Sequence, residues 1–458
     1  MRAPPPDDPY RPLTVAVVGG GLSGTLAAAQ LLRQANAPLR VVLVERRADV
    51  GRGVAYSTRH PRHLLNVPAG RMSARPDRPD SLLDWLRAGP MPDVQAGTFI
   101  PRHLYGDYLA HVLAEAARTA GPGVVLERRR DDVVRLTADA HGAMLELGSG
   151  EGLAADRVVL AVGHGAPQRA VPTPVASSER YAADPWAPGA LDVGPESSVV
   201  LVGTGLTMVD CVLTLAERGH TGPILALSRR GLAPHAHRAG PAVAPDADVP
   251  DAATLVRRLR ASGDEWRGAL DALRPHSAAV WQSLAPAEQR RFLRHLRPYW
   301  DVHRHRIAPE SAATLAAMQA SGQLSVRAGR LVGGVETAGA LALDVRFRGE
   351  SASSRVVAQR VVNCTGTSLA CSDADHPVLA GLLASGAAVR HPLGLGLSVD
   401  DAGALVGADG HASDVLFTLG PLLAGHLWET VAVPEIRAQA AALPARLFAS
   451  VLSTQPAP

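Results

Sequence analysis

Three glycines in G-x-G-x-x-G order, Gly19, Gly21 and Gly24, constrain the fold of this chain more than any other feature. They follow the uncharged apolar run 15–18, which is typical of a buried parallel strand. They open an Ala- and Leu-rich segment, 22–34, that predicts a helix. In such a unit the glycines allow a tight turn, a close approach of the backbone to a pyrophosphate and close helix–strand packing. We therefore predict a dinucleotide site at the N-terminus of this helix.

A second predicted strand, 39–44, ends in Glu45. A carboxylate at this place can accept hydrogen bonds from both hydroxyls of an adenosine ribose and would repel a 2′-phosphate. The alternative is a membrane-spanning or signal segment, because residues 12–32 carry no charge. The glycine spacing and the terminal acid favour the dinucleotide site.

A similar strand–turn–helix–strand pattern recurs over residues 198–227. Here Ser228 takes the acidic position, two arginines follow it, and Met208 replaces the third glycine. Arginines at this place can hold a 2′-phosphate through paired, charge-assisted hydrogen bonds, so we predict NADPH binding. The alternative is that both arginines are merely solvated. The expected contacts are Gly203, Gly205, Leu206, Thr207, Ser228, Arg229 and Arg230.

Composition limits the remaining classes of function. A chain of 458 residues suggests two or three domains, and its net charge of +3 gives no reason to expect a nucleic-acid partner. The sequence contains no lysine, which excludes Schiff-base chemistry and a Walker-type phosphate site. Cys211, Cys364 and Cys371 form no C-x-x-C pair, so neither a dithiol redox centre nor a zinc site is indicated. The Pro-rich start, 1–13, predicts a disordered tail, and the absence of an export signal predicts a cytoplasmic protein.

Residues 240–320 are rich in Arg, His and Trp and predict a helical insertion. Four arginines between 290 and 297 are expected on one helical face, and the segment WDVHRHR, 300–306, follows them. One interpretation is a pocket for an anionic substrate, with Asp301 holding an arginine in place; the other is a solvated basic helix. No metal-ligand spacing is present. The candidate catalytic residues are Asn66, His303, Arg304 and His305.

The motifs GGGLSG, GRGVAY, HLLNVPAGRM, PRHLYGDYL, VGTGLTMVD, WDVHRHR and LGPLLAGHLWETVAVPEIRAQA, taken together, resemble a family of bacterial FAD/NAD(P)-binding proteins. More remotely the chain is similar to the two-dinucleotide flavoproteins, including flavin monooxygenases and amine N-hydroxylases. The resemblance implies an α/β fold with two Rossmann-like dinucleotide-binding domains, FAD in the first and a nicotinamide in the second. The expected domains are an FAD domain over 14–165 and 355–458, and a nicotinamide domain over 166–354 that carries the insertion 240–320.

Several segments outside the glycine turn are expected to reach FAD. The loop 60–77 mixes apolar residues with Pro and Asn and has no regular period, as cofactor-covering loops often do, although a small satellite core is the alternative. Strands ending near residues 163, 364 and 419 are expected in the first domain, and a helix over 428–447 would direct its N-terminus at the flavin pyrimidine. The expected cofactor contacts are Gly19, Gly21, Leu22, Ser23, Gly24, Glu45, Arg46, Gly53, Asn66, Val67, Met72, Val133, Gly163, Thr365, Gly366, Gly420, Pro421, Trp428 and Glu429.

The leading functional hypothesis is an NADPH-dependent flavin monooxygenase that oxygenates a small molecule with O₂ through a flavin C4a-hydroperoxide. In such enzymes the cofactor carries the chemistry, and no catalytic side-chain pair is required. The Baeyer–Villiger fingerprint F-x-G-x-x-x-H-x-x-x-W and the cysteine pair of a disulfide reductase are both missing from the sequence. The alternatives are an NAD(P)H:acceptor oxidoreductase without oxygen insertion and a non-catalytic flavin-binding redox sensor.

Overall fold

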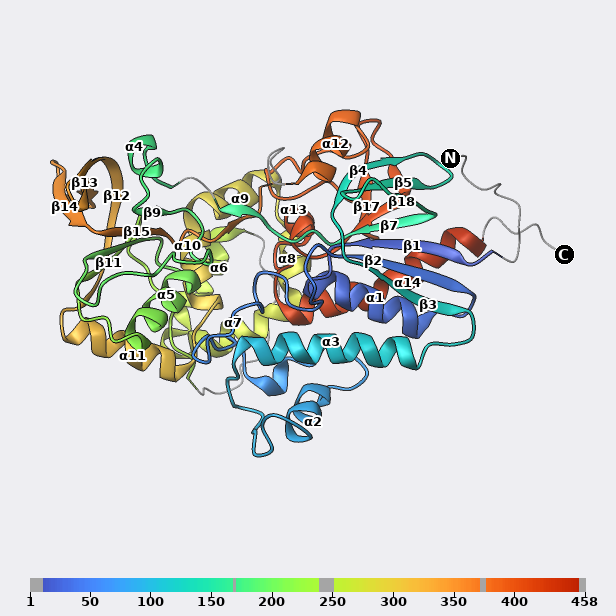
Figure 1. The fold of residues 1–458 in the computed structure, drawn as a ribbon, viewed down its shortest axis with the longest axis horizontal. Helices are drawn as coiled ribbons and strands as arrows, with labels where there is room; N and C mark the ends of the chain where they lie inside the picture. Colours follow the sequence, from blue (N-terminus) through green and yellow to red (C-terminus); the bar gives the residue numbers. More distant parts are fainter. Residues whose placement is uncertain (1–10, 168–169, 239–250, 371–375, 453–458) are drawn as a thin grey trace.

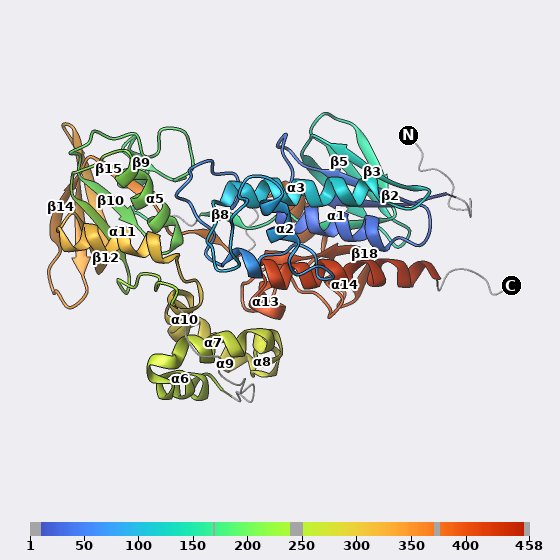
Figure 2. The ribbon, with the colours of Figure 1, turned by 90° about the horizontal axis from the view of Figure 1, so that it is seen from below.

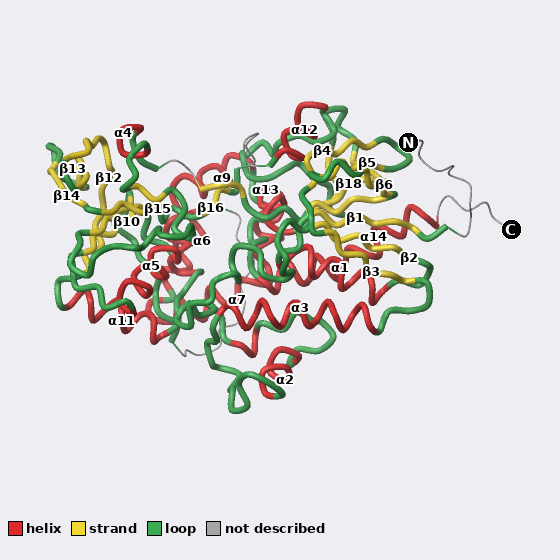
Figure 3. The backbone as a smooth tube through the Cα atoms, in the orientation of Figure 1, coloured by secondary structure: helices red, strands yellow, loops and turns green. Residues whose placement is uncertain are grey.

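The computed structural model describes residues 11–167, 170–238, 251–370 and 376–452. Three predicted features lie at least partly outside these residues: the first ten residues of the N-terminal tail, the beginning of the helical insertion (240–250) and Cys371. Within the described chain the strands gather in two separate groups with most of the helices between and below them (Figure 3). None of the described helices has the length and apolar character needed to cross a membrane.

The first sheet is built around the glycine-rich unit. Its strand order is β17-β18-β7-β1-β2-β3, parallel except for β17 at one edge. Four apolar residues of β1 are completely buried or nearly so, because helices or strands cover both faces of a parallel sheet. The strands are β1 (Leu13–Val18), β2 (Leu39–Val44), β3 (Val124–Arg129), β7 (Arg157–Leu160), β17 (Ala404–Val406) and β18 (Ala412–Thr418).

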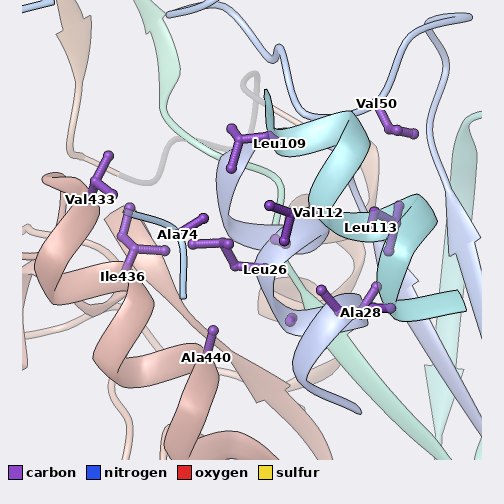
Figure 4. Close-up of a cluster of buried hydrophobic side chains, with 14 of the residues drawn as sticks. Leu26, Ala28, Val50, Ala74, Leu109, Val112, Leu113, Val433, Ile436 and Ala440 are labelled. Carbon is purple, nitrogen blue, oxygen red and sulfur yellow. The ribbon is translucent and has the colours of Figure 1, made fainter. Parts of the chain in front are cut away.

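Three helices cover one face of the first sheet (Figure 1). Leu26 of α1, Leu109 and Val112 of α3, and Ile436 of α14 point toward one another in this core (Figure 4). The opposite face packs against a small three-stranded sheet and α12. These elements are α1 (Leu22–Gln34), α3 (Arg102–Arg118), α14 (Val433–Leu452), β4 (Val133–Ala138), β5 (Ala143–Leu147), β6 (Gly152–Ala155) and α12 (Pro377–Ser385).

The second sheet has the order β14-β13-β12-β11-β10-β15-β9, and its central strands β12, β11, β10 and β15 are parallel. Helices α5 and α11 pack on it through an apolar core. The two sheets confirm the predicted fold class with two Rossmann-like units. The elements are β9 (Tyr181–Ala182), β10 (Val199–Val202), α5 (Leu206–Glu217), β11 (Ile224–Ser228), α11 (Pro309–Ala320), β12 (Leu324–Thr337), β13 (Ala340–Phe347), β14 (Ser354–Ala358) and β15 (Arg360–Asn363).

The pairing partners of β14 and β15 correct the predicted domain boundary at residue 355, because β14 pairs with β13 and β15 with β10. Val361 and Val362 of β15 pair with Val200 and Leu201 of β10, so this strand belongs to the second sheet and not to the first. The apolar strand fits either sheet by composition, and only the hydrogen-bonded neighbour decides between them. The chain crosses between the two units on a two-stranded antiparallel ribbon made of β8 (Gly165–Pro167) and β16 (Thr367–Ser368).

The helical insertion lies below and between the two units (Figure 2). It is shorter than predicted, because α11 packs on α5 as the crossover helix of the second unit. The four arginines do not share one helical face, since a π-helical turn separates Arg291 from Arg297 just before Pro298, whose ring cannot follow an undistorted helix. The insertion contains α6 (Ala252–Ala261), α7 (Trp266–Leu273), α8 (Ser277–Ser283), α9 (Pro286–Arg291), the π-turn (Phe292–Leu296) and α10 (Arg297–Arg304).

The helix predicted over 428–447 also differs. A short helix, α13 (Ala424–Leu427), ends before Trp428, and α14 begins only at Val433. Trp428 has φ +61° and ψ −77°, and the amide of Glu429 donates to the carbonyl of Leu427 at 2.8 Å. This is a γ-turn of the rare, strained hand. The remaining short elements are the 3₁₀ turns at Ala69–Arg71, Gly263–Glu265, Arg274–His276 and Gly420–Leu423, and the helices α2 (Ser81–Arg87) and α4 (Thr173–Ala176).

Candidate nucleotide sites

The first glycine turn contains one glycine that the fold itself does not require. Gly19 has φ +99°, and a Cβ on it would lie 2.5 Å from the carbonyl oxygen of Ala161. A Cβ on Gly24 would lie 1.8 Å from the carbonyl oxygen of Gly19. Gly21, in contrast, has an ordinary φ of −70°, and its Cβ would meet only the backbone of Gly53, at 3.4 Å. A Cβ on Gly21 would therefore make ordinary contact without a clash, so the fold does not require glycine here, whereas the approach of a pyrophosphate to the backbone at the N-terminus of α1 does.

Glu45 is held beside this cradle by the backbone. Its Oε2 accepts a hydrogen bond from the amide of Gly20 at 2.6 Å, and its Oε1 accepts one from the amide of Arg47 at 2.9 Å. Each carboxylate oxygen keeps a further lone pair that a ribose hydroxyl can use. Arg46 next to it is exposed and lies 3.5 Å from Asp132. The position of Glu45 is compatible with the predicted ribose contact, which stays a prediction.

A cleft of about 420 Å³, partly open to solvent, lies at the carboxyl ends of β7 and β18. It brings together Arg46, Gly163 and Pro421, three of the predicted cofactor residues. Ligands of open α/β sheets bind at this edge of the strands. Gly420 is fixed close by, since its amide donates to Oε1 of Gln439 at 2.8 Å. Val133, in contrast, has its side chain inside the core between the two sheets of the first unit, so only its backbone can reach a cofactor.

The second glycine turn repeats the geometry of the first. Gly203 has φ +114°, and a Cβ on it would lie 2.2 Å from the carbonyl oxygen of Cys364. Gly205 has φ −85°, and a Cβ on it would meet no atom within 4 Å. Thr365 and Gly366 continue from Cys364, so they adjoin this second turn and not the first turn, where we had placed them. The residue that differs from the fingerprint, Met208, is completely buried in the core of the unit.

The carboxyl end of β11 carries the predicted 2′-phosphate residues. The hydroxyl of Ser228 accepts from the amide of Gly231 at 3.0 Å and lies 2.9 Å from Oγ1 of Thr204, which closes the turn. Arg229 is exposed, and the guanidinium of Arg230 lies 5.5 Å from the ring centre of Tyr299 in the insertion. Neither arginine forms an ion pair with a carboxylate of the described chain. Both therefore remain available to an anionic ligand.

The candidate catalytic residues do not form one group. The carbonyl of Asn66 bonds to Nε2 of His237 at 2.9 Å, and His303 bonds through Nδ1 to the carbonyl of Tyr299 at 2.7 Å. The amide of His305 donates to the carbonyl of Asp301 at 2.9 Å, and its ring is half-buried. The structure thus assigns none of these side chains to a shared reaction centre.

Arg304, predicted to bind an anionic substrate, is buried in an ion pair. Its side chain is 6% exposed and its Nε lies 3.1 Å from Oε2 of Glu429, which is 5% exposed. Burial alone would raise the pKa of Glu429, but the charge of Arg304 lowers this pKa below its ordinary value. Glu429 also accepts from Nε1 of Trp300 at 2.7 Å. Arg306, likewise, is paired with Asp271, so the basic segment is neutralised by its neighbours.

Trp428 and Glu429 direct their side chains at the insertion, so only their backbone can reach a cofactor, and that contact stays a prediction. The indole of Trp428 stacks on that of Trp281 in α8, with ring centres 5.1 Å apart and an angle of 26°. It belongs to the apolar core of the insertion, together with Phe292 and Trp300. The strained turn therefore serves to attach the insertion to the FAD-side unit.

Sequence reasoning missed the polar contact between the two units. Arg102 at the start of α3 forms a two-point ion pair with Asp210 of α5, at 2.8 and 2.9 Å. The ring of His63 bonds to Oγ1 of Thr214 on the same helix at 2.9 Å and to Thr58 at 2.7 Å. Arg102, His63 and Asp210 are far apart in sequence, in three different motifs (101–109, 63–72 and 202–210), and nothing in the motifs indicates that they meet. The one signal was Asp210 itself, a carboxylate on an otherwise apolar helix.

The fold also brings together two cysteines that their spacing did not connect. The Sγ atoms of Cys211 in α5 and Cys364 after β15 are 3.6 Å apart, and both residues are buried. The hydrogen bond that joins Cys211 to Cys364, together with burial, raises the pKa of Cys211 well above its ordinary value. Since the thiolate is the reactive form, this pair is poorly suited to nucleophilic attack.

The contact at His63 makes the stability of the interface between the units sensitive to acid. Burial, with smaller contributions from His60 and Arg102, lowers the pKa of His63 to about 4. The unfolded chain binds this proton near pH 6.5 and the folded chain does not, so stability is complete above pH 6.5 and falls toward pH 4. The free energy of unfolding, measured with urea, should fall between pH 7 and pH 4. In His63→Gln this fall should be smaller by up to about 3 kcal/mol. The exposed His141→Gln is the control, and equal pH profiles for the two variants would contradict the expectation.

Comparison with known proteins places this geometry among nucleotide-binding folds. Residues 16–165 match the family model described as FAD-NAD(P)-binding. This match confirms the resemblance to FAD/NAD(P)-binding proteins for the first unit. No curated protein matches the sequence.

Solved structures resemble the chain over nearly its whole length. The ornithine N-hydroxylase of Kutzneria sp. 744, solved with reduced FAD, NADP⁺ and L-ornithine, superimposes with a TM-score of 0.66 at 16% identity, over 96% of this chain and 100% of that one. L-lysine 6-monooxygenase from Pseudomonas syringae gives the same values. The FAD-bound cadaverine monooxygenase of Erwinia amylovora gives 0.64 at 14% identity, over 95% of this chain and 94% of that one. These similarities establish the two-dinucleotide fold.

Proposed function

We propose that the protein is an FAD-containing, NADPH-dependent monooxygenase that acts on a small molecule. The observation that carries the proposal is the pair of glycines, Gly21 and Gly205, at the N-termini of α1 and α5. Neither has a positive φ and neither is packed so tightly that a Cβ would clash. An external group that approaches the backbone explains why both positions are glycine, and a dinucleotide pyrophosphate is such a group.

The surroundings of the two turns support different nucleotides. Glu45 beside the first turn suits the free ribose hydroxyls of FAD, whereas Arg229 and Arg230 beside the second suit the 2′-phosphate of NADPH. The FAD-NAD(P)-binding family match covers the first turn, and the similar solved structures include one with FAD and NADP⁺ together. Two dinucleotides bound at facing strand edges would meet near the ribbon of β8 and β16, between the two units.

Bound FAD would take two electrons from NADPH and pass one oxygen atom of O₂ to the substrate. The balanced reaction consumes one substrate, NADPH, O₂ and a proton, and releases the oxygenated product, NADP⁺ and water. The chain itself would hold the pyrophosphates on the backbone amides of α1 and α5, orient the ribose through Glu45 and limit the access of water. The buried attachment of the insertion through Trp428 and Glu429 supports this last role. The few cysteines support a cytoplasmic location, which we retain as a proposal.

The decisive experiment is to reduce the purified flavoprotein with NADPH without oxygen and then to mix it with aerated buffer. We expect reduction of bound flavin by NADPH, followed by a transient absorption band that belongs to neither oxidised nor reduced flavin. Direct return to oxidised flavin, with electrons passed to a quinone, would favour an NAD(P)H:acceptor oxidoreductase. Absence of reduction would favour a non-catalytic flavin-binding sensor.

The same assay tests the nicotinamide. In the Arg229→Ala/Arg230→Ala variant the KM for NADPH should rise about tenfold or more, because two charged hydrogen bonds to the 2′-phosphate are lost. The KM for NADH should stay within about twofold, since NADH lacks this phosphate. An equal loss with both nucleotides would show that the arginines support the fold instead.

A further inference from the structure

A largely apolar pocket lies inside the helical insertion, against the strained turn at Trp428. Its volume is about 370 Å³, part of which is open to solvent. Four aromatic side chains, Trp281, Phe292, Trp300 and Trp428, form much of its wall, with aliphatic side chains of α6, α7 and α8. Ser277 is the one hydroxyl among the lining residues. Apolar walls with a few placed polar groups are typical of sites for small organic molecules.

The pocket offers nothing to a charged ligand. None of its lining residues is ionisable. The cations around it are already paired: Arg304 with Glu429 at 3.1 Å and Arg274 with Glu435 at 2.8 Å. Arg297, whose guanidinium lies 5.6 Å from the ring centre of Trp428, is paired with Asp301 at 3.6 Å. A substrate carboxylate would have to displace one of these carboxylates. The anionic substrate expected from the sequence does not fit these surroundings.

Two polar groups of the wall lack a partner. Oγ of Ser277 and Nε1 of Trp428 are buried without a hydrogen bond to any described residue, and the two residues are 6% and 8% exposed. The other two indoles of the pocket are satisfied, Trp281 by the carbonyl of Gly425 and Trp300 by Glu429. Because buried polar groups normally find a partner, the two free donors indicate a ligand acceptor.

We propose that this pocket binds an uncharged aromatic or alicyclic molecule that carries one oxygen acceptor, held by Ser277 and Trp428. This inference deepens the proposed function and rests on it, since the molecule would be the substrate or its apolar part. Trp428 lies seven residues beyond Pro421, which lines the cleft at the carboxyl edge of the first sheet. The pocket therefore adjoins the segment that leads from the proposed cofactor cleft into α14.

Saturation-transfer NMR on the flavin-loaded protein, without NADPH, tests this assignment with three probes. Acetophenone has a ring and one carbonyl, cumene has nearly the same shape without the acceptor, and L-ornithine is charged. We expect saturable binding of acetophenone, binding of cumene about fivefold weaker, and no binding of L-ornithine. Binding of L-ornithine in preference to acetophenone would overturn the proposal, as would the absence of acetophenone binding.

Two variants on α8 locate the site. Ser277→Ala should weaken the binding of acetophenone about fivefold, because the carbonyl of this probe loses a hydrogen-bond donor. The affinity for cumene, which has no acceptor, should stay within about twofold. Ser283→Ala is the matched control, since its hydroxyl bonds to the carbonyl of Val280 and does not line the pocket. Val280→Phe should fill the pocket and abolish the binding of both probes. Unchanged acetophenone binding in Ser277→Ala would refute the assignment. Failure of NADPH to reduce the flavin, with probe binding intact, would refute the proposed function alone.

Discussion

Gly21→Ala should yield a folded protein that has lost its FAD. A methyl group at this position would lie 3.4 Å from the backbone of Gly53, on the part of the turn where a pyrophosphate must approach the backbone amides. Loss of this approach should weaken the binding of FAD at least about tenfold, which corresponds to about 1.4 kcal/mol of binding free energy. The measurement is the ratio of flavin to protein absorbance after gel filtration.

The fold should tolerate this change. Gly21 has φ −70°, which any residue adopts, and its Cβ would make only ordinary contact with Gly53. Alanine lowers the entropy of the unfolded chain but is a poorer N-cap than glycine, and these opposing effects are each about 0.5–1 kcal/mol. The urea midpoint of the apoprotein should therefore hardly move. Full FAD content in Gly21→Ala would refute the placement of the cofactor.

Two other glycines provide matched controls. Gly205→Ala, the corresponding change in the second turn, should leave the FAD content unchanged and weaken the binding of NADPH instead. Gly24→Ala should fail to fold, because its Cβ would lie 1.8 Å from the carbonyl oxygen of Gly19. The three changes have the same chemistry, so their different outcomes would separate cofactor binding from the needs of the chain.

Glu429→Ala should destabilise the protein by about 3–5 kcal/mol, the usual cost of leaving a buried charge without its partner. Arg304 is 6% exposed and would keep its charge, and the one other carboxylate paired with it, Glu435 at 3.8 Å, already binds Arg274 at 2.8 Å. The hydrogen bond from Trp300 would be lost as well. Urea unfolding followed by tryptophan fluorescence should show the change, since Trp281, Trp300 and Trp428 all lie in the affected core.

An exposed ion pair gives the appropriate comparison. Arg327 and Glu350 lie 3.2 Å apart and are 47% and 41% exposed, so Glu350→Ala should cost no more than about 1 kcal/mol. Replacing both buried partners, as Arg304→Met/Glu429→Leu, should recover much of the loss, because no charge is then left unpaired. If Glu429→Ala were as mild as Glu350→Ala, the buried pair would not be what attaches the insertion.

Local sequence determined the two nucleotide-binding units. The glycine turns, the strands β1, β2, β10 and β11, and the helices α1 and α5 were all predicted at their observed places. Each depends on interactions within about thirty residues: a parallel strand pair, its crossover helix and a turn that only glycine can form. Glu45 and Arg230 could be located for the same reason, since the end of the second strand of such a unit always lies beside its turn.

Only the tertiary structure decided the rest. β15 is an apolar strand that either sheet could have taken, and its pairing with β10 depends on contacts about 160 residues away in the sequence. Arg304 was predicted to bind an anionic substrate, and Trp428 and Glu429 to contact the cofactor, because charged and aromatic residues near a predicted site suggest function. Their true partners come from distant elements, and the free energy of a buried ion pair or a stacked indole depends on those partners and on the exclusion of water. Such information is carried by packing and not by local pattern.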